Sequence, residues 1–353
     1  MRDLGVALPL ISIKARIIAV IQTESPEIFE RAAPDGSHFK VSDSWVRKYV
    51  KGRLGWTYRK ATRAAQKLPK NWEELLLASF LRHVGIIRVY DIPGALRVNV
   101  DQTQYVFQPR SCFTYEKRGA KQVSVVGKDE KRAVTIVVAV SASGELLPFQ
   151  VIFKGRSPAS LPNPHPDDPA LKEAYREAVN LGFHFEYAGK SDTYWSTLET
   201  MKMWVWDTVV PYFKKQKAEL GLRDDHECIL QLDVWSVHAS EEFRQWMWEN
   251  HHEIILVYVP GGCTGLFQPC DVGIQRALKQ ALISSQNEAR VEEAVSLFER
   301  GQAFDKLELN ESLKFLRDRI PSSLVQVYKL LAPKKDFIKM VCIGARLLLN
   351  VTD

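Results

Sequence analysis

Residues 228–259 read CILQLDVWSVHASEEFRQWMWENHHEIILVYV, and this stretch decides the fold of the chain. The run CILQLD at Cys228 to Asp233 and the run EIILVYV at Glu253 to Val259 are short and largely apolar, which is typical of buried strands. Residues 240–250 between them have the pattern of a helix, and a further helix is expected at 271–283. Strands and helices therefore alternate through this part of the chain.

Three extended runs precede this region. LRVNVD at 96–101 ends in a carboxylate, RAVTIVVAV at 132–140 is strongly β-branched, and LLPFQVIFK at 146–154 follows a turn at Gly144. Such a meander is antiparallel, and residues 195–215 then have the pattern of a long amphipathic helix. Three antiparallel strands followed by alternating helices and strands form the element order of the ribonuclease H-like α/β fold, a mixed five-stranded sheet flanked by helices.

Three aspartates lie at the ends of predicted strands or at the start of a predicted helix. Asp101 ends the first strand, Asp233 ends the fourth, and Asp271 opens the helix after the fifth. Because the first and fourth strands are neighbours at the centre of such a sheet, the three side chains are expected to converge on one rim. Like charges at short range repel unless a cation neutralises them, and two Mg²⁺ ions roughly 3.5 to 4 Å apart would do so. Such a pair activates a water or a 3′-hydroxyl at a phosphodiester, which is nuclease and strand-transfer chemistry.

Five segments carry a resemblance to a known family. They are NVDQT at 99–103, KRAVT at 131–135, SGELLPFQ at 143–150, LDVWSVH at 232–238 and QPCDVGIQ at 268–275. In this order they resemble the DDE superfamily endonuclease domain of pogo-like transposases, a family that also includes centromere protein B and jerky-like proteins. The resemblance covers about residues 98–283.

The resemblance implies roles for individual residues. It makes Asp101, Asp233 and Asp271 the catalytic residues and the ligands of two Mg²⁺ or Mn²⁺ ions. It also singles out His238, which would orient a phosphate or carry a proton near the metals; the alternative is a helix-capping or structural histidine. Gln268 would position the third aspartate or touch DNA, and the alternative is that it only shapes its loop.

Two positions depart from the family pattern. Val234 stands directly after the second aspartate, where the family usually has Asn, and Gln102 follows the first, where Glu is usual. Neither change removes a metal ligand, but the hydrogen bond that an Asn amide would make is absent. Val234 therefore favours a chain that has kept the fold and lost cleavage, whereas the complete triad favours an enzyme.

A basic block lies upstream of the strands. Residues 47–70 contain no Asp or Glu, and apolar side chains interleave with the cations at helical spacing, so one face can pack on a small core and the other can meet phosphates. A solvated helix face is the alternative for such a run. Helical patterns at 11–22 and after Pro26 make this the third helix of a helix-turn-helix, and FKVSDSWV at 39–46 resembles the centromere-protein-B-type DNA-binding domain. The residues expected to bind DNA are Arg47, Lys48, Lys51, Arg53, Arg59, Lys60 and Arg63.

The length and composition limit the number of domains and exclude several classes of protein. With 353 residues, 46% of them apolar and 25% charged, the chain is long enough for a large domain plus a smaller one and too apolar to be disordered or fibrous. A net charge of +6 is too mild to imply a partner by itself. The five cysteines contain no C-x-x-C pair, and no run reaches the roughly 18 uncharged residues of a membrane span. The expected regions are a helix-turn-helix domain at 1–70, a helical linker at 71–97, the catalytic domain at 98–285 and a C-terminal helical region at 286–353.

These observations predict a DNA transposase-type endonuclease and strand transferase. Its partners would be double-stranded DNA, both transposon terminal inverted repeats and target DNA, and a second copy in a homodimer. Residence in the nucleus follows from chromosomal DNA as the substrate. The alternative is a domesticated, transposase-derived, sequence-specific DNA-binding protein without cleavage activity. A ribonuclease H or a Holliday-junction nuclease on the same fold is less favoured, because neither needs the basic N-terminal module.

Overall fold

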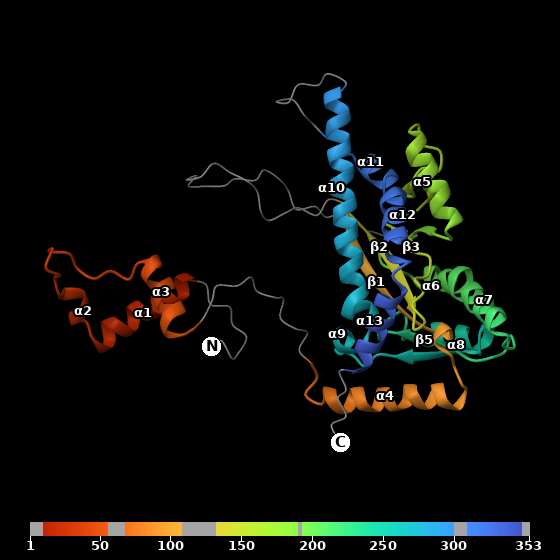
Figure 1. Ribbon diagram of the computed structural model, residues 1–353, viewed down its shortest axis with the longest axis horizontal. Coiled ribbons are helices and arrows are strands. Elements are labelled where there is room, and N and C mark those ends of the chain that lie inside the picture. The colour runs from red at the N-terminus through yellow and green to blue at the C-terminus, as the bar shows by residue number, and fades with distance from the viewer. Residues whose placement is uncertain (1–9, 56–67, 108–131, 190–192, 300–308, 348–353) are drawn as a thin grey trace. The chain divides into compact units, whose positions relative to one another are not determined.

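The computed structural model describes residues 10–55, 68–107, 132–189, 193–299 and 309–347. The chain forms two compact units that divide between Leu68 and Pro69. The first unit holds three N-terminal helices, and the second holds a β-sheet with its covering helices (Figure 1).

Aromatic side chains gather around the third described helix of the N-terminal unit. The helices of this unit are α1 (Leu10–Glu24), α2 (Glu27–Glu30) and α3 (Asp43–Arg53). Ser42 caps α3, because its side-chain oxygen accepts a hydrogen bond from the backbone N–H of Trp45. The Trp45 ring stacks on Tyr49 at 5.1 Å and meets Phe39 edge-on at 5.2 Å. Since α2 is a single turn of 4 residues, the assignment of a helix-turn-helix stays a prediction.

The second unit is built on a six-stranded mixed sheet. Its strands are β1 (Arg97–Val106), β2 (Ala133–Ser141), β3 (Gln150–Phe153), β4 (His184–Tyr187), β5 (Cys228–Leu232) and β6 (Ile254–Tyr258). They lie in the order β4-β3-β2-β1-β5-β6. β1, β2 and β3 form the antiparallel meander, and β5 and β6 run parallel to β1. Without β4 this is the ribonuclease H-like arrangement that the element order predicts.

The expected number of five strands is wrong, because β4 adds a sixth at the edge of the sheet. It pairs in parallel with β3, from His184 opposite Gln150 to Tyr187 opposite Phe153. Helix α5 (Pro169–Asn180) precedes it and begins at the end of the proline-rich loop, where the side chain of Asp168 accepts a hydrogen bond from a backbone N–H of the first turn. Four residues are too few to show a strand period, so HFEY was not recognisable as a strand.

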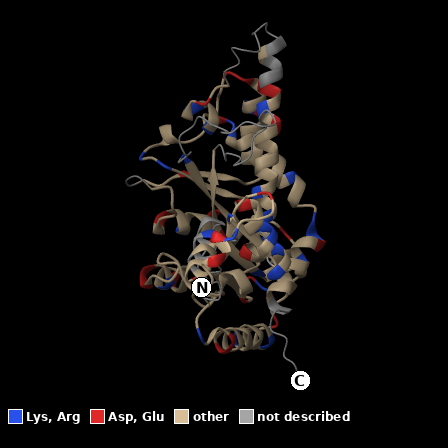
Figure 2. Cartoon of the chain, turned by 90° about the vertical axis from the view of Figure 1, so that its left-hand side faces the viewer, with Lys and Arg blue, Asp and Glu red and all other residues tan. Residues whose placement is uncertain are grey.

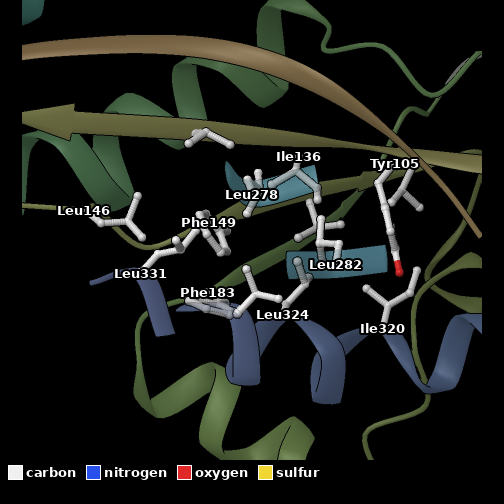
Figure 3. Close-up of a cluster of buried hydrophobic side chains, with 14 of the residues drawn as sticks. Tyr105, Ile136, Leu146, Phe149, Phe183, Leu278, Leu282, Ile320, Leu324 and Leu331 are labelled. Atoms are coloured by element: carbon white, nitrogen blue, oxygen red, sulfur yellow. The ribbon is translucent and has the colours of Figure 1, made fainter. Parts of the chain in front are cut away.

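Helices cover both faces of the sheet. Those on one face are α5, α10 (Gln275–Glu299), α12 (Ile320–Leu331) and α13 (Lys335–Leu347). Figure 3 shows how side chains of this layer, such as Leu282 of α10 and Leu324 of α12, meet Ile136 of β2 in one buried cluster. The helices on the other face are α6 (Leu198–Trp204), the π-helical η3 (Val205–Val209), α7 (Val210–Leu220) and α8 (Glu241–Asn250). The C-terminal helices therefore complete the core of the sheet unit.

Charged residues are rare in the strands, whose ribbons are mostly tan in Figure 2. In the six described strands the Asp, Glu, Lys and Arg residues are Arg97, Asp101 and Glu186. Arg97 opens β1 and Glu186 lies on the edge strand, whereas Asp101 lies in the middle of β1 and is 8% exposed. Because an isolated buried carboxylate is costly, its presence at the centre of the sheet indicates a functional demand.

Helix α4 (Trp72–Val89) lies across one end of the sheet unit (Figure 1). Its Leu76 packs against Val259 and against Phe267 of the short helix α9 (Thr264–Phe267). Residues expected to form a linker thus contact the loop before the third aspartate. The remaining short helices are η1 (Gly94–Leu96), η2 (Pro158–Ser160) and α11 (Leu313–Asp318). Within the described ranges, none of the helices has both the length and the apolar character that crossing a bilayer requires.

Gly144 is expected to resist substitution because a neighbouring backbone approaches it closely. Its φ is +95°, and a Cβ at this position would lie 2.5 Å from the carbonyl oxygen of Lys335. Gly144→Ala should therefore lower the free energy of unfolding by more than the roughly 1–3 kcal/mol of backbone strain alone. Urea unfolding would measure the loss. Gly189→Ala is the matched control, since Gly189 has a φ of +74° but nothing within 4 Å of an added Cβ. Equal losses in the two variants would contradict the close approach.

Candidate active site

The first two predicted aspartates lie at the same level of the sheet. In the parallel pair of β1 and β5, Asn99 lies opposite Gln231. Asp101 follows Asn99 by two residues, and Asp233 follows Gln231 by two residues, directly after β5 ends. Since side chains two residues apart lie on the same face of a strand, the register directs both carboxylates to one region.

Asp233 is held by His238. The two residues are joined by a contact of 2.5 Å between Nδ1 of His238 and Oδ1 of Asp233, and the histidine is 1% exposed. The hydroxyl of Tyr258 donates a hydrogen bond of 2.7 Å to the backbone oxygen of His238. Ser240 caps the following helix α8, with its hydroxyl oxygen accepting from the backbone N–H of Phe243. His238 is therefore not a helix cap, and it contacts the second aspartate.

The partners of His238 indicate which ring nitrogen carries the proton. Its Nε2 lies 3.4 Å from the amide nitrogen of Gln102, which can only donate. Nε2 is then an acceptor, and Nδ1–H donates to the carboxylate of Asp233. A glutamate at position 102, as the family pattern has it, offers no such donor at neutral pH. Gln102 therefore suits the tautomer in which Nδ1–H points at Asp233.

Asp271 lies in a π-helical turn, η4 (Cys270–Ile274), that opens α10. Turns of this kind insert an extra residue into a helix and are frequent at functional sites. Gln268, just before the turn, is 0% exposed, and its Nε2 lies 3.4 Å from the backbone oxygen of Val100. It therefore shapes this loop and does not reach the surface to touch DNA. Gly273 of the same turn lies against α13, because an added Cβ would be 2.7 Å from Cγ2 of Val341.

The three aspartates act on one another electrostatically. The pKa of Asp101 is raised from 3.8 to about 8, first by burial and then by the carboxylates of Asp271 and Asp233. The backbone N–H of Gln102, 2.8 Å from Oδ1 of Asp101, opposes this shift. Among the described residues, the groups that govern this pKa include no cationic side chain. Within the described residues, no cationic side chain therefore offsets the charge that Asp101 would carry.

One carboxylate oxygen of the three aspartates accepts a hydrogen bond from a neutral side-chain amide. Nε2 of Gln275 donates to Oδ2 of Asp101, and Oε1 of Gln275 lies 3.4 Å from Nζ of Lys279. Over the ranges that the structure describes, no three Asp, Glu, His or Cys side chains are arranged to hold a metal ion as they stand. The aspartates thus share one electrostatic environment without forming a preformed metal cage.

The donor set nevertheless fits a divalent cation. Carboxylate oxygens are the hard ligands that Mg²⁺ and Mn²⁺ prefer, and here they come from three separate elements. A buried carboxylate that two others repel is stabilised when a cation replaces its proton. To bind such an ion through Oδ2, Asp101 would have to release the amide of Gln275.

The expected DNA-binding residues are described in part. Arg47, Lys48, Lys51 and Arg53 lie on α3 and are exposed. Val46 on the same helix is 0% exposed, so α3 has one apolar and one cationic face. The remaining three, Arg59, Lys60 and Arg63, lie outside the described residues.

Two side chains of the site, Asn99 and Gln275, were missed by the sequence reasoning. Asn99 joins β1 to the backbones of β5 and η4, and Gln275 reaches Asp101 from α10. Their spacing from the aspartates was visible, since Asn99 lies two residues before Asp101 on the same strand face and Gln275 lies about one helical turn after Asp271. A neutral residue at such a spacing is not distinctive by itself.

Comparisons with known proteins agree on one family. A family model described as DDE superfamily endonuclease matches residues 130–325. Pogo transposable element with ZNF domain of Homo sapiens is 27% identical over 267 residues, and Jerky protein of Mus musculus is 25% identical over 159 residues. These matches cover 72% and 44% of this chain but only 16% and 24% of the two relatives, so the chain spans a small part of their length.

A solved structure, the Mos1 mariner paired end complex with Mn, matches at 12% identity with a TM-score of 0.44. This match covers 95% of this chain and 75% of that chain.

Proposed function

The chain belongs to the DDE superfamily of endonucleases, and from this premise we propose that it is a DNA transposase-type endonuclease and strand transferase. Its substrates are double-stranded DNA, namely transposon terminal inverted repeats and target DNA. It acts in the nucleus as a homodimer. The similarity to a human pogo transposable element protein supports this class of substrate.

The buried carboxylate of Asp101 carries the proposal. It lies in the middle of β1, its pKa is raised to about 8, and the carboxylates of Asp271 and Asp233 contribute to that shift. A fold gains nothing from a charge-repelling cluster at this place, so we infer that a cation is its natural partner.

Each residue of the site has a role in the proposed reaction. Asp101, Asp233 and Asp271 hold two Mg²⁺ or Mn²⁺ ions, which supply activation of a water or a 3′-hydroxyl and stabilisation of the leaving oxygen. His238 orients Asp233 through Nδ1–H, and Gln102 keeps the imidazole in that tautomer. Gln268 holds the loop before Asp271 on β1.

The cationic face of α3 binds the DNA backbone in this proposal. Arg47, Lys48 and Lys51 are exposed on the side of this short helix that faces away from the buried Val46, and Arg53 is exposed at its end. Contacts of this kind bind the phosphates of the DNA backbone and do not depend on the base sequence. Base recognition is then left to other side chains of the same unit.

The test is Mg²⁺-dependent nicking of DNA that carries the element's own terminal repeats. The wild-type chain should nick it, and Asp233→Ala should reduce nicking to the level without enzyme, because one of the three ligands is gone. Asp167→Ala is the control, since this aspartate is exposed in the loop before α5 and should leave the rate unchanged. If the wild type and Asp233→Ala behave alike, catalysis by this site is rejected.

A second candidate is a domesticated DNA-binding protein without cleavage. Val234 favours it, because this residue is 47% exposed directly after Asp233 and cannot make the hydrogen bond of the usual Asn. The same assay decides between the two. In the domesticated case the wild type binds the repeats but nicks no faster than Asp233→Ala.

A further inference from the structure

We propose that Asn99 is a positioning residue that keeps the three aspartates in register, an inference that rests on the metal-dependent function proposed above. Its side chain bridges two other segments of the chain. Nδ2 donates a hydrogen bond of 3.2 Å to the backbone oxygen of Gln231 at the end of β5. Oδ1 accepts one of 3.0 Å from the backbone N–H of Cys270 at the start of η4.

The three residues that meet here each precede an aspartate. Asn99 stands two residues before Asp101, Gln231 two residues before Asp233, and Cys270 directly before Asp271. The side-chain amide of Asn99 therefore fixes the positions of three backbone segments, those of β1, β5 and η4, relative to one another. Because the partners are 132 and 171 residues away in sequence, nothing local to β1 supplies this alignment.

The chemistry of the contact demands an amide. A backbone carbonyl can only accept and a backbone N–H can only donate, so the bridging group must do both at opposite ends. A carboxylate cannot donate to Gln231, and an alkyl side chain can bond to neither backbone group in this place, where Asn99 is only 4% exposed. A serine hydroxyl is too short to reach both.

Neighbouring contacts fasten the same junction. Sγ of Cys270 lies 3.7 Å from the backbone oxygen of Asn99, and Nε2 of Gln268 lies 3.4 Å from that of Val100. These contacts tie η4 to β1, whereas Asn99 also reaches β5. Without the amide of Asn99, β1, β5 and η4 are no longer held to one another at this point. The apolar core around them stays packed.

A substitution here should be tolerated by the fold. A cavity of about 10 Å³, which has room for about one water, is lined in part by Asn99 and Gln231. In Asn99→Ala a water can satisfy the two backbone groups, but it does not fix the distance between them. The expected defect is thus in the geometry of the aspartates and not in folding.

The experiment measures Mn²⁺ binding to the full chain without DNA, from the electron paramagnetic resonance signal of free Mn²⁺. Asn99→Ala should weaken binding about 10- to 100-fold, the range typical of residues that orient metal ligands. Nicking by this variant should need correspondingly more Mn²⁺ for half-saturation, with the rate recovering at high Mn²⁺.

The matched control is Gln150→Ala. Gln150 is another buried amide, 1% exposed, whose Nε2 donates 2.9 Å to the backbone oxygen of Thr200 on the opposite face of the sheet. The melting temperature of Gln150→Ala should fall by about as much as that of Asn99→Ala, because each variant loses a buried amide. Its affinity for Mn²⁺ should nevertheless stay within about twofold of the wild-type value.

The possible results distinguish a failure of the role proposed for Asn99 from a failure of the metal-dependent function. Wild-type affinity in Asn99→Ala, or an equal loss in Gln150→Ala, overturns the positioning role. A wild-type chain that binds no Mn²⁺ overturns the metal-dependent function itself and the role of Asn99 with it. If Asn99→Ala does not fold, Asn99→Ser, which can keep one of the two hydrogen bonds, should still lose affinity by about threefold or more; wild-type affinity there also overturns the role.

Discussion

Asp101→Asn is expected to abolish DNA cleavage and, in the same molecule, to stabilise the metal-free fold above neutral pH. The amide has no charge with which to hold the ions of the proposed reaction. A loss of about 4 kcal/mol of transition-state stabilisation corresponds to a rate about a thousandfold lower. Initial rates of Mg²⁺-dependent nicking measure this part of the prediction.

The gain in stability follows from the direction of the pKa shift. Folding raises the pKa of the Asp101 carboxyl from 3.8 to about 8, so the folded chain holds this proton more tightly than the unfolded chain. The resulting stabilisation is complete below about pH 4 and is lost as the pH rises to about 8. Asparagine cannot ionise, and the variant should exceed the wild type by an amount of the order of 5 kcal/mol at alkaline pH.

Urea unfolding in the presence of a chelator, from about pH 5 to pH 9, tests this second part. The two free energies of unfolding should diverge between about pH 5 and pH 8, because in this range only the wild type releases the Asp101 proton when it unfolds. Asp167→Asn removes an exposed carboxylate and should follow the wild type at every pH. Parallel curves for Asp101→Asn and the wild type would mean that the three carboxylates do not share one environment.

Leu324→Ala is expected to cost about 2–5 kcal/mol of unfolding free energy, the usual range for deleting a buried leucine side chain. Leu324 of α12 is 0% exposed and lies in the cluster that contains Phe149 and Leu278 (Figure 3). The cavity left behind would border the sheet itself. The loss should therefore appear in the unfolding of the whole sheet unit, as measured by urea denaturation followed by tryptophan fluorescence.

Leu330→Ala provides the control on the same helix. Leu330 is 51% exposed, and its removal should change stability by no more than about 0.5 kcal/mol. Helix propensity is nearly the same in both variants, so the difference isolates burial. A small effect of Leu324→Ala would show that α12 is not part of the core of the sheet unit.

The sequence predicts those elements that are long enough to show a period or a run. RAVTIVVAV became β2, in which all 9 residues are buried, and the two apolar runs that flank residues 240–250 became β5 and β6. β4 escaped prediction because its 4 residues form a strand only where β3 offers an edge. The π-helical turn η4 is also invisible to periodicity, since it displaces the pattern by a single residue.

The aspartates could be predicted because charges at the ends of apolar strands are conspicuous. Asn99 and Gln275 could not, because they are neutral and their partners lie far away along the chain. Asn99 bonds backbone atoms of Gln231 and Cys270, and a hydrogen bond to a backbone atom leaves no trace in the identity of the partner residue. The neutral partners of a site therefore have to come from coordinates.

The contact between Gly273 and Val341 bears on the order of events during synthesis. Asp271 lies in a turn that is seated against α13, which is made after all six described strands. At about 5–20 residues per second, the roughly 240 residues from Asp101 to this helix take about 10–50 s to leave the ribosome. Throughout that interval the nascent chain has its first aspartate but no seat for the third. The nuclease proposed here would thus emerge inert and become competent to cut only once α13 has been made.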